Sequence, residues 1–469
     1  MSFRNRFVNP TQLSFCLLLG LSASVTVGAA PNADQTESPV NFDSAVQAFD
    51  EQFQNGEFEA CIDTGKWMLM ALADMPNATS LERGAILAKL ARAQHRAGRL
   101  EPAQQNYAAA LDLISNETTH LDEQLEQPTW EYARLLDGAG DASNAAQLYE
   151  RALHLHTVNN GVQSTGLADY LQEVSDFYMR IGDDKQARAL QVYRVDLLRR
   201  QYGRDSLEIL PALYDYAAML EKTGDKIGAQ NEYRDIMRRI VKSEGRRSHL
   251  MIPVTGRLAN LFLYNEMYDG YDGVKQARRY YEVMMKIAER NEQATTAQKV
   301  QAFSGMGDYY TLKTNNAVKA ESFYRKAWQA MAADPKTSEQ LDEYFGDPLT
   351  LNDLPTVHST NFAYWRDRVR RRGMKRGSVV VRYDVGTDGR MQNPRVVESE
   401  PYRFKDFLVV KQLRRFVHRP AMRDGEAVVS RDHEYRFEYA YWDHEYNEFL
   451  EKGIGRPKQP RTVAAVADK

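Results

Sequence analysis

The residues that come closest to a reaction centre lie near the end of the chain, in the run His444-Glu445-Tyr446-Asn447-Glu448. On a helix, His444 and Glu448 would stand one turn apart, a spacing that two metal ligands can use. A zinc hydrolase needs a second histidine in such a run and a third ligand, and neither is present. We therefore expect a solvated acidic end to the last strand, with a metal-binding protein or enzyme as an alternative.

Other reactive side chains are equally isolated. His154 and His156 are two residues apart, so they point to different faces of a helix and cannot chelate one ion together. Cys61 follows Ala60 on an apolar helix face, which predicts a buried, inert thiol. The sequence has no phosphate-binding glycine loop, dinucleotide fingerprint, nucleophile elbow or zinc cysteine pair. It thus predicts a protein that is not an enzyme and needs no cofactor.

Charge narrows the class of partner. The 469 residues carry a formal net charge of −3 at pH 7, which argues against a chain dominated by nucleic-acid binding. A net charge so close to zero says little else about the partner.

Residues 1–29 have the architecture of an export signal: two early arginines, an apolar run at Leu13–Leu21 and small residues up to Ala29. We expect cleavage near Ala29 and a periplasmic chain whose residues 30–39 form a polar, disordered tether. The alternative is an uncleaved anchor that holds the protein in the inner membrane, facing the periplasm.

A helical hairpin at Leu213–Ile236 sets the pattern for residues 40–335. Its two helices each offer a small residue, which lets them approach closely, and an aromatic side chain follows four residues after the second. The first small position recurs every 42 residues, at Ala91, Ala133, Ser175, Ala217 and Ala259. The second recurs at Ala103, Ala145, Ala187 and Ala229, followed by Tyr107, Tyr149, Gln191 and Tyr233. Turn glycines keep the same period, at Gly56, Gly98, Gly140, Gly182 and Gly224.

Looser copies flank this series, at Ala48 and Ala60 before it and at Gly307, Tyr310, Ala320, Tyr324 and Ala327 after it. A loop insertion interrupts the fifth unit near Tyr268–Gly273. We count about seven hairpins.

These positions resemble the tetratricopeptide repeat, whose usual period is about 34 residues, in the longer form found in kinesin light chains. The resemblance implies a mainly α chain with an α-solenoid, whose first helices line a groove for an extended peptide. The side chains expected to face that groove are Arg92, His95, Trp130, Arg134, Gln172, Asp176, Tyr214, Asn260 and Asp308. Each of them could also be merely solvated.

Residues 336–373 read as a linker, because Pro348 and Pro355 interrupt any helix. A dense basic run from Arg366 to Arg376 lies at its end. This run could attract an anionic membrane surface, or it could be a solvated connector that extends by self-repulsion.

From residue 374 to 442 the hydrophobic period changes from helical to strand-like. Strands are predicted at Ser378–Val385, Met391–Ser399 and His433–Tyr441, with a helix at Tyr402–Val417. The order strand, strand, helix, strand predicts a small α+β domain, and residues 443–469 are expected to be a disordered tail.

Motifs in this domain resemble the C-terminal domain of TonB-family energy transducers. They are Gly377-Ser378-Val379-Val380-Val381, Asp388-Gly389-Arg390, Val396-Val397-Glu398-Ser399, Arg414-Arg415-Phe416, Arg419-Pro420-Ala421 and Asp424-Gly425. Two features depart from the family pattern: Tyr364-Trp365 replaces the usual Tyr-Pro, and the run Phe407-Leu408-Val409-Val410 replaces an alanine-rich helix start.

The resemblance implies that the last strand is an edge that accepts an extended peptide, at Glu434, Tyr435, Arg436, Phe437, Glu438 and Tyr439. That edge could instead pair with itself in a homodimer. We expect a periplasmic, non-enzymatic adaptor that binds envelope proteins or peptides, among them outer-membrane receptors or components of the TonB system. The alternative is a membrane-anchored TonB-type energy transducer.

Overall fold

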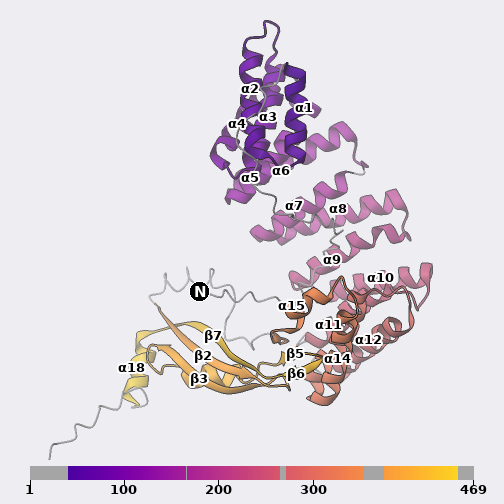
Figure 1. The fold of residues 1–469 in the computed structure, drawn as a ribbon, viewed down its shortest axis with the longest axis vertical. Helices are drawn as coiled ribbons and strands as arrows, with labels where there is room; N and C mark the ends of the chain where they lie inside the picture. The colour runs from indigo at the N-terminus through magenta and orange to yellow at the C-terminus, as the bar shows by residue number, and fades with distance from the viewer. Residues whose placement is uncertain (1–40, 165, 265–270, 353–373, 453–469) are drawn as a thin grey trace, which may run out of the picture. The chain divides into compact units, whose positions relative to one another are not determined.

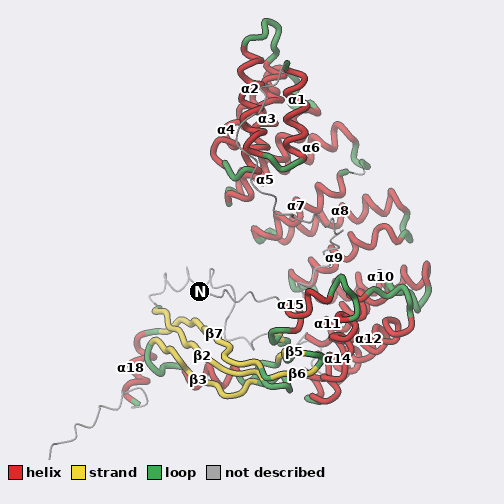
Figure 2. Tube along the Cα trace, viewed as in Figure 1, coloured by secondary structure: helices red, strands yellow, loops and turns green. Residues whose placement is uncertain are grey.

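The computed structural model describes residues 41–164, 166–264, 271–352 and 374–452. The export signal, the tether, the start of the predicted loop insertion, most of the basic run and the end of the tail lie outside these ranges. The described chain divides into two compact units, one on each side of the boundary between Glu232 and Tyr233. Figures 1 and 2 show helices up to residue 345 and a strand-rich domain near the C-terminus.

The first unit is a succession of antiparallel helix pairs. Its helices are α1 (Phe42–Gln54), α2 (Phe58–Ala73), α3 (Ser80–Arg96), α4 (Leu100–Glu117), α5 (Glu126–Ala139), α6 (Ala142–Asn160), α7 (Leu167–Ile181), α8 (Asp184–Tyr202) and α9 (Leu210–Lys222), with short 3-10 turns η2 (Glu123–Leu125) and η3 (Leu207–Ile209). Helix α10 (Lys226–Glu244) spans the boundary between the units.

The small residues of the 42-residue pattern are buried, as the repeat requires. Ala91, Ala133, Ala217 and Ala259 are each 0% exposed, and Ser175 is 1% exposed. The second set is equally enclosed, with Ala103, Ala145, Ala187 and Ala229 at 0%. The prediction of stacked helical hairpins in one register is therefore confirmed.

The register of the first hairpin differs from the predicted one by a single residue. Ala48 and Ala60 are only half-buried, whereas their neighbours Phe49 and Cys61 are 2% and 0% exposed. Phe49 stands 42 residues before Ala91, and Cys61 stands 42 before Ala103. The first hairpin thus keeps the phase of the others, with larger side chains in the contact positions.

The turn glycines have the backbone that the sequence predicts. The five glycines of the series, from Gly56 to Gly224, have φ between 76° and 86°, in the left-handed region that favours glycine. A second series, which the sequence analysis missed, lies between hairpins at Gly161, Gly203 and Gly245, with φ of 85°, 90° and 83°.

After α10, the second unit has four more α-helices and a π-helical turn in the described part of its repeat region. They are α11 (Met251–Tyr264), α12 (Tyr271–Arg290), α13 (Thr296–Tyr309), a π-helical turn η5 (Tyr310–Thr314) and α14 (Ala317–Ala332). The predicted linker carries structure before its described part ends, with η6 (Ser338–Gln340), α15 (Leu341–Phe345) and the short strand β1 (Leu349–Thr350).

The C-terminal domain has the predicted order of strands and helix, with additional short strands. Its elements are β2 (Lys375–Val385), β3 (Met391–Glu400), α17 (Asp406–Leu413), β4 (His418–Arg419), β5 (Ala421–Arg423), β6 (Glu426–Val428), β7 (Ser430–Tyr441) and α18 (Asp443–Glu451). The main sheet is antiparallel, in the order β3-β2-β7, while β1 pairs with β4 and β5 pairs with β6.

Two boundaries in this domain were predicted wrongly. Helix α17 is shorter than the predicted Tyr402–Val417, because Arg403 and Lys405 have left-handed φ of 58° and 66° and cannot continue a helix. Residues 443–451 form α18 rather than a disordered tail, since Tyr446 and Phe449 pack against Phe404.

Candidate interaction surfaces

Ion pairs connect the first helices of successive hairpins at a constant spacing. Arg92 Nε lies 2.6 Å from Glu131 Oε1, Arg134 pairs with Glu173, and Lys89 Nζ lies 2.6 Å from Asp50 Oδ1. In each pair the two residues are 39 apart. Arg92 and Arg134, which were expected to face a partner, are therefore already engaged with neighbouring repeats.

These ion pairs form a ladder along the repeats. The ladder changes at the next step, where both equivalent positions carry an acid. The positions equivalent to Arg134 and Glu173 are Asp176 and Asp215, and two carboxylates cannot form an ion pair with each other. Asp215 instead accepts a hydrogen bond from Arg194 Nη1 at 2.8 Å, and Asp176 accepts one from Gln172 Nε2 at 2.9 Å.

A polar network supports this exception. Gln191, which occupies the position of the repeated tyrosine, is 2% exposed and donates through Nε2 to Gln172 Oε1 at 2.8 Å. Arg194 is 9% exposed and donates to the same oxygen. The exposed carboxylate of Asp176 is thus the acidic group on the ladder that no cation neutralises among the described residues.

The remaining predicted groove residues are partly or fully enclosed. Trp130 is 6% exposed, and its ring meets Tyr149 and Tyr170 at centroid distances of 5.0 and 4.2 Å. The expectation that Trp130 faces a ligand is wrong, because it packs inside the repeat. Desolvation, aided by Arg96, lowers the pKa of half-buried His95.

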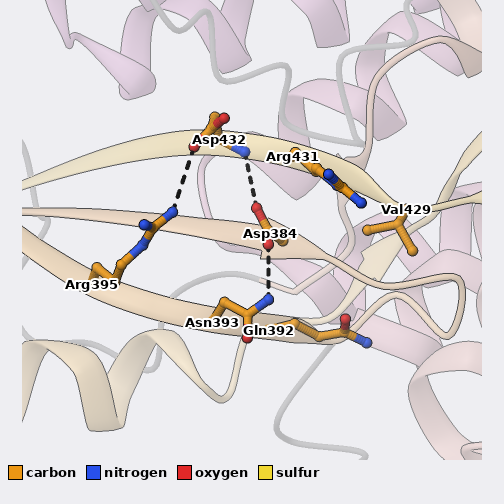
Figure 3. Close-up of a pocket in the computed structure, with 7 residues that line it drawn as sticks. All are labelled: Asp384, Gln392, Asn393, Arg395, Val429, Arg431 and Asp432. Atoms are coloured by element: carbon orange, nitrogen blue, oxygen red, sulfur yellow. Dashed lines mark hydrogen bonds and ion pairs between the residues drawn. The ribbon is translucent and has the colours of Figure 1, made fainter.

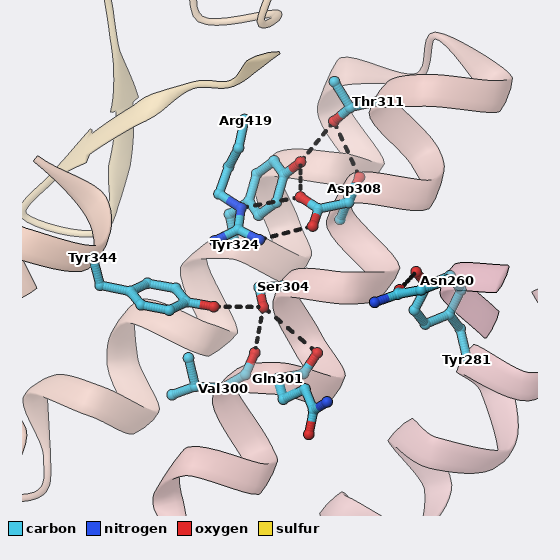
Figure 4. Close-up of polar contacts among 11 residues, drawn as sticks. Asn260, Tyr281, Val300, Gln301, Ser304, Asp308, Thr311, Tyr324, Tyr344 and Arg419 are labelled. Carbon is cyan, nitrogen blue, oxygen red and sulfur yellow. Dashed lines mark hydrogen bonds and ion pairs between the residues drawn. The ribbon is translucent and has the colours of Figure 1, made fainter. Parts of the chain in front are cut away.

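Tyr214 and Asn260 are also partly buried. Asn260 accepts a hydrogen bond from the phenol of Tyr281 at 2.5 Å (Figure 4), so its Oδ1 is already used.

Asp308 departs furthest from its expected role. It is 6% exposed, and it accepts hydrogen bonds from Arg419 Nε at 3.0 Å and Nη2 at 2.7 Å (Figure 4). Arg419 itself is 5% exposed. The prediction that Asp308 lines an open groove is wrong, since an arginine of the C-terminal domain covers it.

Aromatic residues enclose this ion pair. The guanidinium of Arg419 lies 5.2 Å from the ring centroid of Tyr344 and 5.7 Å from that of Tyr324. The Tyr324 phenol donates to Asp308 at 2.9 Å and also meets Thr311 Oγ1 at 2.9 Å. Burial and the Asp308 carboxylate raise the pKa of Tyr324 well above its usual value, so it remains a hydrogen-bond donor.

Further contacts join the same two parts of the second unit. Arg325 on α14 donates to Gly425 O at 3.3 Å and to Glu426 at 2.6 Å. Met422 on β5 is 2% exposed in one apolar cluster with Tyr324 and Phe345. The last helical hairpin and the β5-β6 hairpin therefore share a core, and their ribbons are labelled next to each other in Figure 1.

The predicted peptide-binding strand lies at the edge of the main sheet. Among the described strands, β7 pairs with β2 alone. Along Glu434 to Tyr439 the residues alternate, with Glu434, Arg436 and Glu438 exposed, Phe437 and Tyr439 buried, and Tyr435 half-buried between these extremes. Arg436 forms an ion pair with Glu398 across the sheet at 2.6 Å.

The opposite edge strand, β3, is less suited to pair with another chain. Pro394 has no N–H to donate, Asn393 has a left-handed φ of 50°, and the β2-β3 register shifts twice. From His433 onward β7 has no proline, glycine or left-handed residue. Of the two edges, β7 is the one that offers an uninterrupted row of backbone groups.

An open hollow lies where β2, β3 and β7 meet, lined in part by Asp384, Asn393, Arg395 and Asp432 (Figure 3). The Asp384 carboxylate accepts hydrogen bonds from Asn393 Nδ2 at 2.9 Å and from the backbone N–H of Asp432 at 3.1 Å, and these bonds lower its pKa. Asp432 lies 3.8 Å from Arg395. The acids of this hollow are thus already satisfied by their neighbours.

Residues considered for chemistry are scattered. His444 and Glu448 are exposed on α18, and no group of three or more His, Cys, Asp or Glu in the described ranges is placed to hold a metal ion. His154 is exposed while His156 is 6% exposed and meets Glu126 Oε1 at 2.7 Å. Cys61 is buried, and desolvation raises its pKa to about 11, so its thiolate is disfavoured.

No helix in the described ranges combines the length and the apolar character needed to cross a bilayer.

Comparison with known proteins adds a family for the C-terminal domain. Residues 360–440 match the family described as the C-terminal domain of the Gram-negative bacterial TonB protein. The chain thus combines a region of stacked helical repeats, similar to kinesin-light-chain tetratricopeptide repeats, with a TonB C-terminal domain. No curated protein matches the chain.

Solved structures resemble the helical region. The TPR-like repeats of a Podosopora anserina protein assigned to the kinesin light chains are 16% identical, with a TM-score of 0.39, over 44% of this chain and 99% of that one. A tetratricopeptide repeat protein from Parabacteroides merdae is 14% identical (TM-score 0.34; 64% and 96% covered). Aspartyl phosphate phosphatase F from Bacillus subtilis is 11% identical (TM-score 0.40; 73% and 86% covered). The assignment of the repeats rests on the register and burial described above.

Proposed function

We propose that this protein is a periplasmic, non-enzymatic adaptor with two binding surfaces. The ladder face of the helical repeats binds one envelope protein, and the edge of β7 binds an extended segment of another. An outer-membrane receptor of a TonB-dependent transport system is the partner class that fits the second surface.

The observation that carries this proposal is the edge position of β7 within a domain of the TonB C-terminal family. An added strand gains affinity from main-chain hydrogen bonds, whatever its sequence, and gains selectivity from alternate side chains. On β7 the alternate exposed side chains are Glu434, Arg436 and Glu438. A partner strand with complementary charges at alternate positions therefore fits this edge.

The first surface is the ladder face of the helical repeats. Its ladder of ion pairs holds successive hairpins in register, and the exposed carboxylate of Asp176 offers a point for a basic side chain. Repeats of this kind bind through many such positions rather than through one pocket.

Site-specific crosslinking in envelope extract tests the β7 edge. A photoreactive residue at Glu438 should capture a discrete envelope protein. The same residue at Val397, which is 43% exposed on the interrupted edge strand β3, is the matched control and should capture far less. Equal capture at both positions, or capture of a second copy of the chain at Glu438, would contradict the adaptor.

A further inference from the structure

The outer face of α17 exposes large apolar side chains at its first turn. Val409 and Leu413 face the domain core and are 3% and 1% exposed. Phe407, in contrast, is 81% exposed, and Leu408 is 41% exposed. A phenylalanine left this open in a small domain with a filled core indicates a surface that something covers.

The rest of that face is cationic. Lys411, Arg414 and Arg415 are exposed. Lys411 follows Leu408 and Phe407 by three and four residues, which places it on the same side of the helix, and Arg414 and Arg415 come directly after the helix ends at Leu413. None of the three makes an ion pair with a residue that the structure describes. Three other exposed arginines of the domain, Arg382, Arg395 and Arg436, do have such partners.

The acid on this helix does not neutralise the face. Asp406, in the first turn, accepts a hydrogen bond from Ser399 on β3, and desolvation raises its pKa. The loop before the helix adds Tyr402, which is 51% exposed with the Arg403 guanidinium 5.6 Å from its ring centroid. The apolar side chains of Phe407 and Leu408 thus lie beside the cationic side chains of Lys411, Arg414 and Arg415, which have no ion-pair partner among the described residues.

We propose that this face of α17 docks on an anionic phospholipid bilayer. Phe407 and Leu408 would enter the boundary between headgroups and acyl chains, where their burial is favourable. Lys411, Arg414 and Arg415 would lie at the level of the lipid phosphates, which supply the negative charge that the protein lacks there. The docking surface is the outer face of α17, whereas the peptide-binding edge is the backbone of β7.

Fluorescence on the full chain tests the insertion directly. Phe407→Trp should shift its emission to the blue and become shielded from aqueous quenchers with phosphatidylglycerol-containing vesicles, but not with phosphatidylcholine vesicles. Val318→Trp is the matched control, since Val318 is 79% exposed on α14 in the same unit, and it should show no shift. If the emission of the Phe407→Trp variant did not shift on anionic vesicles, the proposal would be overturned.

Flotation with the same vesicles measures the apolar and the electrostatic contributions to binding separately. Phe407→Ser, and separately the pair Lys411→Glu with Arg414→Glu, should each weaken binding at least about tenfold. The controls Val318→Ser and Arg279→Glu with Arg290→Glu should bind as the unchanged chain does. Binding that survives both α17 variants, or polyglutamate that binds this face as tightly as vesicles do, would show that lipid is not the occupant.

Discussion

Arg419 and Asp308 are 111 positions apart in sequence, yet the Arg419 guanidinium donates hydrogen bonds to both carboxylate oxygens of Asp308, at 3.0 and 2.7 Å. Both side chains are nearly inaccessible to water. Because Asp308 lies on α13 and Arg419 on β4, this pair joins the last helical hairpin to the TonB C-terminal domain. The end of the repeat region is therefore capped by the domain that follows it rather than by a polar helix.

Breaking this pair on one side should be costly. Asp308→Ala leaves a buried guanidinium without a counter-charge, and we expect the second unit to lose about 3 to 5 kcal/mol of unfolding free energy in urea. Replacing both partners with apolar residues, as Asp308→Leu with Arg419→Met, should restore most of that loss.

The exposed pair between Arg325 and Glu426 provides the control, because Arg325→Ala should cost no more than about 1 kcal/mol. If Asp308→Ala were as mild as Arg325→Ala, the pair would not hold the two parts together.

His418 should make the stability of this unit depend on pH. It is 1% exposed, and desolvation, with smaller contributions from His433 and Arg390, lowers its pKa to about 4. The unfolded state therefore binds a proton between about pH 6.5 and 4 that the folded state does not. Stability is complete above this window and should fall by roughly 3 kcal/mol as the pH drops through it.

Urea unfolding at several pH values measures this slope. His418→Gln should flatten it, leaving the smaller slope expected from His433, whose pKa is lowered in the same direction. His444→Gln, on exposed α18, should leave the slope as it is. A slope unchanged by His418→Gln would contradict the assignment.

Substituting Gly307 with even the smallest side chain should destabilise the protein. A Cβ at this position would lie 2.3 Å from Tyr324 Cε1, and the ring cannot move away because its hydroxyl is bonded to Asp308 and Thr311. We expect Gly307→Ala to cost about 1 to 3 kcal/mol by thermal or urea unfolding. Gly138→Ala is the control, since nothing lies within 4 Å of its Cβ, and it should stabilise α5 by about 0.5 to 1 kcal/mol.

The helical register could be predicted because close helix contacts require small residues, and these recur at a fixed spacing. The same argument failed at the first hairpin, where a large side chain occupies the position of the small residue and a glycine occupies the position of the tyrosine. Phe49 fills the first contact, and Gly65 stands 42 residues before Tyr107, with a Cβ that would lie 3.4 Å from the Phe49 ring. Packing constrains the combined volume of the two side chains that face each other at a helix contact. A search for alanine at both positions finds only one of the combinations that give this volume.

The candidate sites were predicted less well. Helical position marked Trp130 and Asp308 as groove residues, but contacts from other elements decide whether a position stays open. The partner of Asp308 comes from a different fold type more than a hundred residues away, and no local pattern in the sequence indicates it. The position of β7 at the edge of the sheet was easier to predict, because strand order in a small sheet follows from the family pattern.

The ladder of ion pairs predicts a stabilising substitution. Asp176→Arg would place a cation opposite Asp215, as Arg134 stands opposite Glu173, and would remove the repulsion between the two acids. We expect a gain of about 0.3 to 1 kcal/mol at low salt, decreasing as salt is added. Asp112→Arg, at an exposed site on α4, should give no comparable gain. If the helical face binds a basic segment through Asp176, the same substitution should also weaken capture of that partner.

The N-terminus of the mature protein distinguishes the adaptor from a membrane-anchored energy transducer. Residues 1–29 have the order of an export signal, and the small residues up to Ala29 suit cleavage there. We expect the protein purified from the periplasm to begin near Ala30, and a start at Met1 in the membrane fraction would instead support the transducer. Replacing Ala29 with a bulky residue should block cleavage and retain the chain in the inner membrane, and the same change at Ala33 should leave processing unaffected. A transducer must span the periplasm from its anchor, so release of the chain by cleavage is incompatible with that role.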